Sequence, residues 1–393
     1  MNDARGKTYL SKNIVVLSAV SFLNDIGSEI IMPILPIFLA TLGGGAVALG
    51  LLGGLEESVS GLFKILTGYF TDRLRRRRVF VFSGYFISAF SKLMLPFSAI
   101  WQHVVALRPF DRIGKGVRTP PRDALIADSS VEAGRGRAFG FHRAFDTLGA
   151  VVGSASALFL FAYMGFGLNI IILAAGIISF LALMPLILVK DPARISGARR
   201  IVFKFRNLPK PLLKYYFTAG LFTLGNFSYM FLIIWATGGG FVFEPAKISL
   251  SLSLYILFNV VYAILSFPAG AVSDRLGRRK TLIIGYMVFA FTNLVFMFYI
   301  SILGLIIGFI LYGVFNALTE ATQRAFVVDL APEELRGTII GSFQALISIL
   351  TFISSLVAGF IWTFIGAQFI FVYGVVLACL ASGLLVTLSF KPG

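Results

Sequence analysis

Long apolar stretches separated by short turns follow one another along almost the whole chain. A helix of about 20 apolar residues crosses the hydrocarbon core of a bilayer. Only 13% of the 393 residues are charged, roughly half the fraction found in an ordinary soluble domain. The sequence therefore predicts an all-α membrane protein. We expect twelve transmembrane helices, near 12–41, 46–71, 79–98, 101–127, 137–162, 167–189, 212–236, 245–272, 281–300, 302–328, 337–364 and 367–389.

Lysine and arginine are concentrated in alternate loops. Such residues are enriched in cytoplasmic loops. Here they cluster around 73–78, 135–137, 190–214 and 275–280, whereas the loops between these hold almost none. The alternation predicts a multi-pass protein with both termini cytoplasmic, in the cytoplasmic (inner) membrane of a prokaryote. Topology thus accounts for the net charge of +16, and no nucleic-acid partner is expected.

The segment 108–146 places many ionisable residues in two consecutive spans. Such groups cost about 2–3 kcal/mol each at membrane depth unless they pair or line a water-filled path. We therefore predict a buried charged network, with Glu56, Glu57 and Lys64 of the second helix as further members. The members in the fourth and fifth helices are Arg108, Asp111, Arg112, Lys115, Arg118, His142, Arg143 and Asp146.

The first helix carries two carboxylates, Asp25 and Glu29, four residues apart and hence on one helical face. That face is expected to point inward, because lipid does not tolerate two carboxylates. Two like charges so close favour retention of a proton on one of them. The pair is then a proton carrier or a cation ligand. An ion pair with Lys64 or an arginine of the fourth helix is the alternative, and the sequence leaves both open.

A short motif occurs twice. GYFTDRLRRRR at 68–78 returns as GAVSDRLGRRK at 270–280, an offset of 202, and Glu132 falls on Glu333 at an offset of 201. Duplication of six helices is the signature of two parallel transporter halves. The basic segment 191–211 differs in composition from the apolar stretches on either side. We therefore expect it to connect the two halves. We expect a six-helix bundle at 1–190, a cytoplasmic linker at 191–211 and a second bundle at 212–393.

On this duplicated loop the chain resembles the major facilitator superfamily. The second copy fits the family signature G-x-x-x-D-R-x-G-R-[RK] fully, and the first has Arg75 in place of the second glycine. The resemblance implies that the loop's aspartate and arginine hold one transport state together. The gating residues it implies are Gly68, Asp72, Arg73, Gly270, Asp274 and Arg275.

The fourth and fifth helices resemble those of the drug–proton antiporters of this family only in part. Arg108 stands where the family has an arginine, but Arg112 stands where a glycine is expected. Gly140, Gly149 and Gly153 have the antiporter spacing, whereas Ser154 replaces its proline. The resemblance implies export. His142 and Asp146, one turn apart, are either a proton relay or a buried hydrogen-bonded pair.

The second half has few charges and many aromatic and amide side chains in its helices. Such residues suit an apolar binding wall with a few hydrogen-bonding groups. The substrate-binding candidates are Phe222, Asn226, Tyr229, Tyr255, Asn259, Tyr262 and Glu320.

These features predict a secondary active transporter, not an enzyme, which exports an amphiphilic small molecule in exchange for protons. Asp25, Glu29 and Asp146 are the proton carriers, and Arg108, Arg112 and Lys115 tune them or meet an anionic group of the cargo. Protons, cargo and lipid are the expected partners, the chain is expected to be a monomer, and no cofactor or resident metal is expected. Two alternatives stay open, namely export of a metal–chelator complex or divalent cation, and a receptor or scaffold that kept this fold.

Overall fold

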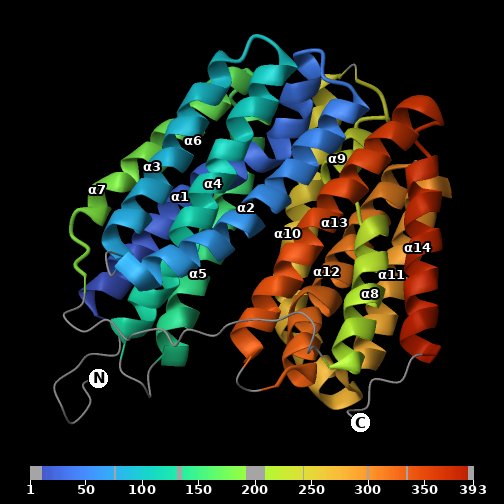
Figure 1. The fold of residues 1–393 in the computed structure, drawn as a ribbon. Coiled ribbons are helices and arrows are strands. Elements are labelled where there is room, and N and C mark those ends of the chain that lie inside the picture. Colours follow the sequence, from blue (N-terminus) through green and yellow to red (C-terminus); the bar gives the residue numbers. More distant parts are fainter. Residues whose placement is uncertain are drawn as a thin grey trace. The chain divides into compact units, whose positions relative to one another are not determined.

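A computed structural model describes residues 11–74, 77–130, 135–191, 209–241, 243–298, 301–332 and 335–387, with side chains except at 68–74, 135–136 and 336–338. Every regular element in these ranges is a helix (Figure 1). The first half contains α1 (Lys12–Thr41), α2 (Ala46–Leu74), α3 (Arg77–Met94), a 3-10 turn (Leu95–Phe97), α4 (Trp101–Asp128), α5 (Arg135–Ala162), α6 (Leu168–Leu181) and α7 (Leu183–Leu186). The second half contains α8 (Lys210–Gly225), α9 (Met230–Ala236), α10 (Pro245–Leu276), α11 (Arg278–Phe298), α12 (Ile302–Leu330), α13 (Arg336–Phe364) and α14 (Phe369–Thr387).

Two expected helices are interrupted. The stretch expected at 167–189 divides into α6 and α7 around Ala182, three residues before Pro185, whose ring clashes with the preceding turn of a helix. The stretch expected at 212–236 breaks after Gly225, where Asn226 leaves the helical region with φ −95° and ψ 81°. The Ser228 amide then donates to the Ser355 hydroxyl (3.1 Å), which satisfies a backbone group that the helix has released.

Eleven helical segments of the described chain are long and apolar enough to cross a membrane. The segments α6–α7 and α8–α9 each count as one of these. The helix that falls outside this set is α4, whose 28 residues carry the charged stretch recognised in the sequence. The chain is therefore a multi-pass membrane protein, and twelve spans with cytoplasmic termini remain a prediction.

The chain forms two compact units, one of residues 1–43 and 59–199 and one of residues 44–58 and 200–393. The predicted bundle boundaries stay a prediction, because the first part of α2 groups with the second unit. Most of the predicted linker, residues 192–208, lies outside the described residues.

The interiors of the two units differ in chemistry. In the first unit α1 packs on α5 and α3 packs on α4, around an aliphatic core that includes Ile14, Leu17 and Val81. The second unit is filled by aromatic rings: Phe222 stacks on Tyr286 with centroids 3.7 Å apart. Among the charged side chains that the structure describes as buried, all but Glu56 belong to the first unit. The ionisable groups at membrane depth are thus gathered mainly there.

Candidate functional site

The carboxylates of α1 lie where α1 and α5 touch backbone to backbone. A Cβ on Gly149 would stand 2.7 Å from the Phe22 carbonyl oxygen and 3.2 Å from the Asp25 Cβ. A Cβ on Gly153 would stand 2.6 Å from the Ile26 carbonyl oxygen and 2.9 Å from the Glu29 Cβ. Two of the three antiporter-type glycines therefore set the helix spacing at the two carboxylates. The third, Gly140, faces open space.

A second close approach brings α3 against α4. A Cβ on Gly114 would stand 2.7 Å from the Ser88 amide nitrogen, so only glycine fits there. This proximity lets the Ser88 hydroxyl donate to Asp111, whose carboxylate is buried. Gly114 therefore sets the spacing of α3 and α4 at Asp111.

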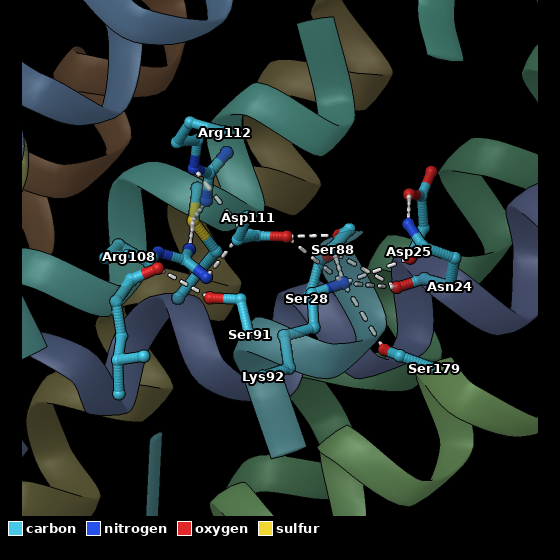
Figure 2. Close-up of polar contacts among 12 residues, drawn as sticks. Asn24, Asp25, Ser28, Ser88, Ser91, Lys92, Arg108, Asp111, Arg112 and Ser179 are labelled. Carbon is cyan, nitrogen blue, oxygen red and sulfur yellow. Dashed lines mark hydrogen bonds and ion pairs between the residues drawn. The ribbon is translucent and has the colours of Figure 1, made fainter. Parts of the chain in front are cut away.

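Asp111 is the centre of the charged network (Figure 2). Arg108 Nη1 donates to its Oδ2 at 2.8 Å, and Arg112 Nε lies 3.6 Å from the same oxygen. Both guanidinium groups also reach the Met32 sulfur of α1, at 3.4 Å each. A buried carboxylate surrounded by cations is held ionised, and it in turn fixes the position of the arginines.

The third cation at Asp111 is Lys92 of α3, which the sequence reasoning missed. Its Nζ lies 3.7 Å from Asp111 Oδ1, and the side chain has no solvent exposure at all. The signal was present in the sequence: Lys92 is a single lysine inside an otherwise apolar stretch, and an ionisable residue at membrane depth points to function by default.

Lys92 connects Asp111 to the first helix. It donates to Asn24 Oδ1 at 3.1 Å and to the Ser28 hydroxyl at 2.7 Å. The amide of Asn24 then donates onward to Asp25 Oδ1 at 3.3 Å. The helices α4, α3 and α1 thereby share one continuous set of polar contacts from Asp111 to Asp25 (Figure 2).

Asp25 faces a second group of charges. Asp146, Arg118, Lys115 and Arg122 are the charged groups that interact with it electrostatically. Asp146 Oδ1 lies 3.6 Å from His142 Nε2, and Nδ1 of the same ring is 3.3 Å from the Ser18 hydroxyl. Gly149, one turn after Asp146 on α5, packs against Asp25, so both carboxylates belong to the α1–α5 contact.

Two arginines of α4 contact residues of other helices, and Arg122 also pairs with the adjacent residue of α4. Arg118 lies over the Tyr85 ring, 4.5 Å from its centroid. Arg122 donates to the Ser21 hydroxyl at 3.1 Å and pairs with Asp123 at 3.0 Å. The first unit thus assembles Asp25, Asp111, Arg108, Arg112, Arg118, His142 and Asp146 from the residues proposed in the sequence.

Other proposed members of the network are placed differently. The side chains of Lys64, Lys115 and Arg143 are exposed. Glu56 is buried and Glu57 is exposed, both on the part of α2 that groups with the second unit. Their roles stay a prediction.

The second copy of the duplicated loop forms an ion-pair chain at the start of α11. Asp274 Oδ1 lies 2.5 Å from Arg278 Nη1, and Arg278 Nε lies 3.4 Å from Asp329 Oδ2. Arg275 is exposed. In the first copy the side chains of Gly68, Asp72 and Arg73 lie outside the described residues, but Arg77, which precedes Arg278 by 201 residues and likewise begins a helix, pairs with Asp128.

One substrate-binding candidate of the second unit belongs to its aromatic core. The others lie at the break after α8 or along α10 and α12. Phe222 is buried in the ring stack. Asn226 sits at the break after α8, and Tyr229 just beyond it lies 5.6 Å from the Tyr255 ring. On the neighbouring turns, Asn259 donates to the Tyr255 carbonyl and the Tyr262 hydroxyl donates to Glu320. Glu320 also pairs with Arg324 at 2.9 Å.

Among the described residues, no group of three or more His, Cys, Asp or Glu side chains could hold a metal ion. The polar atoms that converge in the first unit are instead mixed in charge, with lysine and arginine cations interleaved among carboxylates.

Similarity to known proteins identifies the family of this chain. The family model of the Major Facilitator Superfamily matches residues 17–255 and 215–392. An uncharacterized MFS-type transporter of Methanocaldococcus jannaschii is 43% identical over 379 residues, covering 96% of this chain and 94% of the relative. The multidrug resistance protein MdtG of Klebsiella pneumoniae is 24% identical, covering 88% of this chain and 85% of that protein. The crystal structure of a mutant of the nucleoside transporter NupG superposes with a TM-score of 0.80 at 14% identity, over 94% of this chain and 99% of that one. This chain belongs to the Major Facilitator Superfamily and is a membrane transporter, not an enzyme.

Proposed function

We propose that this transporter exports an amphiphilic small molecule in exchange for protons, by alternating access. The observation that carries the proposal is the pair Asp25 and Asp146, which share one site beside the arginines of α4. A carboxylate that can lose and regain a proton changes the charge of such a site by one unit. That change is what a proton-coupled transporter needs.

The coupling is a competition for the cations. With Asp25 ionised, its charge attracts Arg118, Lys115 and Arg122. Protonation removes that attraction, so the cations move to other partners or to an anionic part of the cargo. A proton shifts the balance between two states only through such a difference in interaction energy.

The second unit is proposed to hold the apolar part of the cargo. Tyr255, Asn259 and Tyr262 follow one another along α10, with Tyr229 before α9 against Tyr255 and Glu320 of α12 against Tyr262. Aromatic faces with a few hydrogen-bonding groups accept diverse amphiphiles. The distant likeness to a multidrug resistance protein supports the same class of cargo.

The proposal includes a monomer in the cytoplasmic membrane of a prokaryote, with both termini inside. Cys379 is the single cysteine of the chain. In a Cys379→Ser background, Lys12→Cys and Tyr163→Cys are expected to label from opposite sides of the membrane. Labelling of both from one side would overturn the topology.

The activity is tested in reconstituted vesicles with an imposed pH gradient. The panel contains a lipophilic cationic dye, a neutral amphiphile, an anionic chelator and a divalent metal. Uphill movement of the dye or the amphiphile that collapses with an uncoupler and in Asp25→Asn would support proton antiport. Glu244→Gln, which neutralises an exposed carboxylate paired only locally with Lys247 among the contacts described, is the matched control.

Two results would contradict the proposal. Movement that survives both the uncoupler and Asp25→Asn would mean a facilitator or another coupling ion. Movement of only the metal or the chelator would favour the alternative cargo.

A further inference from the structure

The ammonium group of Lys92 lies in a cage of oxygen atoms. Four oxygens lie within hydrogen-bond range: Ser28 Oγ at 2.7 Å, Asn24 Oδ1 at 3.1 Å, Ser179 Oγ at 3.3 Å and the Asn24 carbonyl at 3.5 Å. Asp111 Oδ1 is the fifth, at 3.7 Å. The five oxygens come from α1, α4 and α6, while the lysine itself is on α3 (Figure 2).

The cage offers more acceptors than the lysine can use. An ammonium group has three N–H donors, whereas five oxygens surround it. An excess of carbonyl, amide and hydroxyl oxygens, completed by one carboxylate, is the ligand set of a hard cation.

The cage is closely packed, and Ser28 is the one partly exposed residue among those that supply its oxygens. Lys92 and Ser179 have no solvent exposure, and Asn24 is 1% exposed. Its walls allow little movement: a Cβ on Gly27 would strike the Ser179 hydroxyl. A Cβ on Gly176 would stand 2.8 Å from the Leu93 Cα. Burying a cation is costly unless its environment is built for it, and here three helices supply that environment.

We propose that Lys92 is a tethered cation, whose ammonium group occupies a monovalent-cation site built by α1, α4 and α6. The inference rests on the proposed proton-coupled transport and names a further coupling residue for it. When the coupling proton leaves, one N–H bond of the ammonium breaks and its electron pair stays on the nitrogen. The proton passes to water on the side of Asp25, whose side chain is partly exposed.

Loss of that proton changes the whole network. The charged groups that face Lys92 are Asp111, Arg108 and Arg118 of α4 and Asp25 of α1. With a neutral amine, Asp111 keeps its two arginine partners and the Ser88 hydroxyl among the contacts described, and the oxygen cage loses its cation. The contact of α3 with α1, α4 and α6 then weakens at Lys92. This weakening is the proposed switch between the two states of the transport cycle.

The first test measures cation binding and needs no transport. Thermal unfolding of purified wild type and Lys92→Ala is followed in sodium, potassium and choline buffers. We expect wild type to respond equally to all three. Lys92→Ala should be stabilised saturably by sodium or potassium but not by choline, and Ser179→Ala added to it should raise the half-saturating concentration several-fold. Lys190→Ala, at an exposed lysine of the same unit outside the charged network, is the matched control.

A flat response of Lys92→Ala to all three cations would overturn the proposal. If that variant cannot be purified in any buffer, the pH profile of transport is measured instead in Ser28→Ala, which retains Lys92. Removing the nearest oxygen destabilises the charged amine, so transport should become half-maximal at a lower pH. An unchanged pH profile would overturn the proposal as well.

The second test separates this inference from the proposed function. If wild-type vesicles show no proton-driven transport, the proposed function fails, whatever the unfolding measurements show. If wild type is proton-driven, Lys92→Ala should lose pH-driven accumulation but keep downhill exchange, and an imposed sodium or potassium gradient should restore part of the accumulation. Full pH-driven accumulation in Lys92→Ala would show that Lys92 is not a coupling residue.

Discussion

Arg278 Nε lies 3.4 Å from Asp329 Oδ2, and the same ion pair exists 201 residues earlier between Arg77 and Asp128. Each arginine is at the start of a helix, and each aspartate is near the end of the next long one. The offset is 202 at Asp72 and Asp274 but 201 here, so the second copy has one fewer residue between the loop aspartate and the arginine. The duplication seen in the motif therefore extends to a contact that the motif does not contain.

The two copies of this ion pair are expected to differ in strength. Arg77 and Asp128 are 5% and 16% exposed, whereas Arg278 and Asp329 are 27% and 53% exposed. Breaking a buried pair leaves an uncompensated charge and costs about 3–5 kcal/mol, while an exposed pair contributes about 0–1 kcal/mol. Asp128→Asn should therefore lower the unfolding temperature in detergent clearly more than Asp329→Asn. Equal shifts would contradict this ranking.

A side chain at Gly153 should separate α1 from α5. Gly153→Val places atoms where the Ile26 carbonyl lies, and this contact is rigid because backbone atoms form it. We expect loss of monodisperse protein in size-exclusion chromatography and a transport rate below about a tenth of wild type. A tenfold loss of rate corresponds to about 1.4 kcal/mol of activation free energy. Gly140→Val, in open space on the same helix, should retain both. Similar losses in the two variants would refute the argument.

Removal of the Asp146 charge should reduce coupling without unfolding the protein. Asp146→Asn keeps the shape of the side chain and its position 3.6 Å from His142. If Asp146 carries the exchanged proton, pH-driven accumulation should fall at least about tenfold, equivalent to 1.4 kcal/mol, while downhill movement of the cargo persists. Unchanged accumulation would assign the His142–Asp146 contact to structure alone.

The contact of Arg118 with Tyr85 should depend on the aromatic face. A desolvated cation–π contact contributes about 1–2 kcal/mol. Tyr85→Phe retains the ring beneath Arg118, whereas Tyr85→Leu removes it. We expect a lower unfolding temperature for the leucine variant than for the phenylalanine variant. Equal losses in the two variants would show that the tyrosine hydroxyl, which both lack, is the stabilising group.

Most of the helical plan could be predicted from the sequence, because a membrane-length apolar run has one common solution, a helix. The expected spans 12–41, 101–127 and 302–328 agree with α1, α4 and α12 to within two residues. The break after Gly225 was not expected, because the sequence there has no proline and a glycine followed by asparagine is a weak signal. Asn226 leaves the helix, and the Ser228 amide that follows it donates to the Ser355 hydroxyl of α13. The break therefore depends on a tertiary contact.

The charged network was predicted in composition but not in its connections. Arg108 lies three residues before Asp111, so their contact follows from helical spacing, whereas the contact of Arg112, the adjacent residue, does not. Lys92 reaches Asp111 only because Gly114 lets α3 and α4 approach closely. Its stretch is so apolar on average that the single charge was overlooked. The amide of Asn24, which links Lys92 to Asp25, could not have been recognised without the fold.

The edge-to-face contact between Trp235 and Trp362, with centroids 6.0 Å apart, gives the protein an internal optical reporter. The chain has three tryptophans, and these two share the second unit, while Trp101 begins α4 in the first. Intrinsic fluorescence is therefore weighted toward the aromatic unit proposed to hold the cargo. Cargo binding should change the emission strongly, whereas proton exchange at Asp25 or Lys92 should leave it nearly unchanged. Without any added label, the emission then reports cargo binding in the second unit and is insensitive to proton exchange in the first.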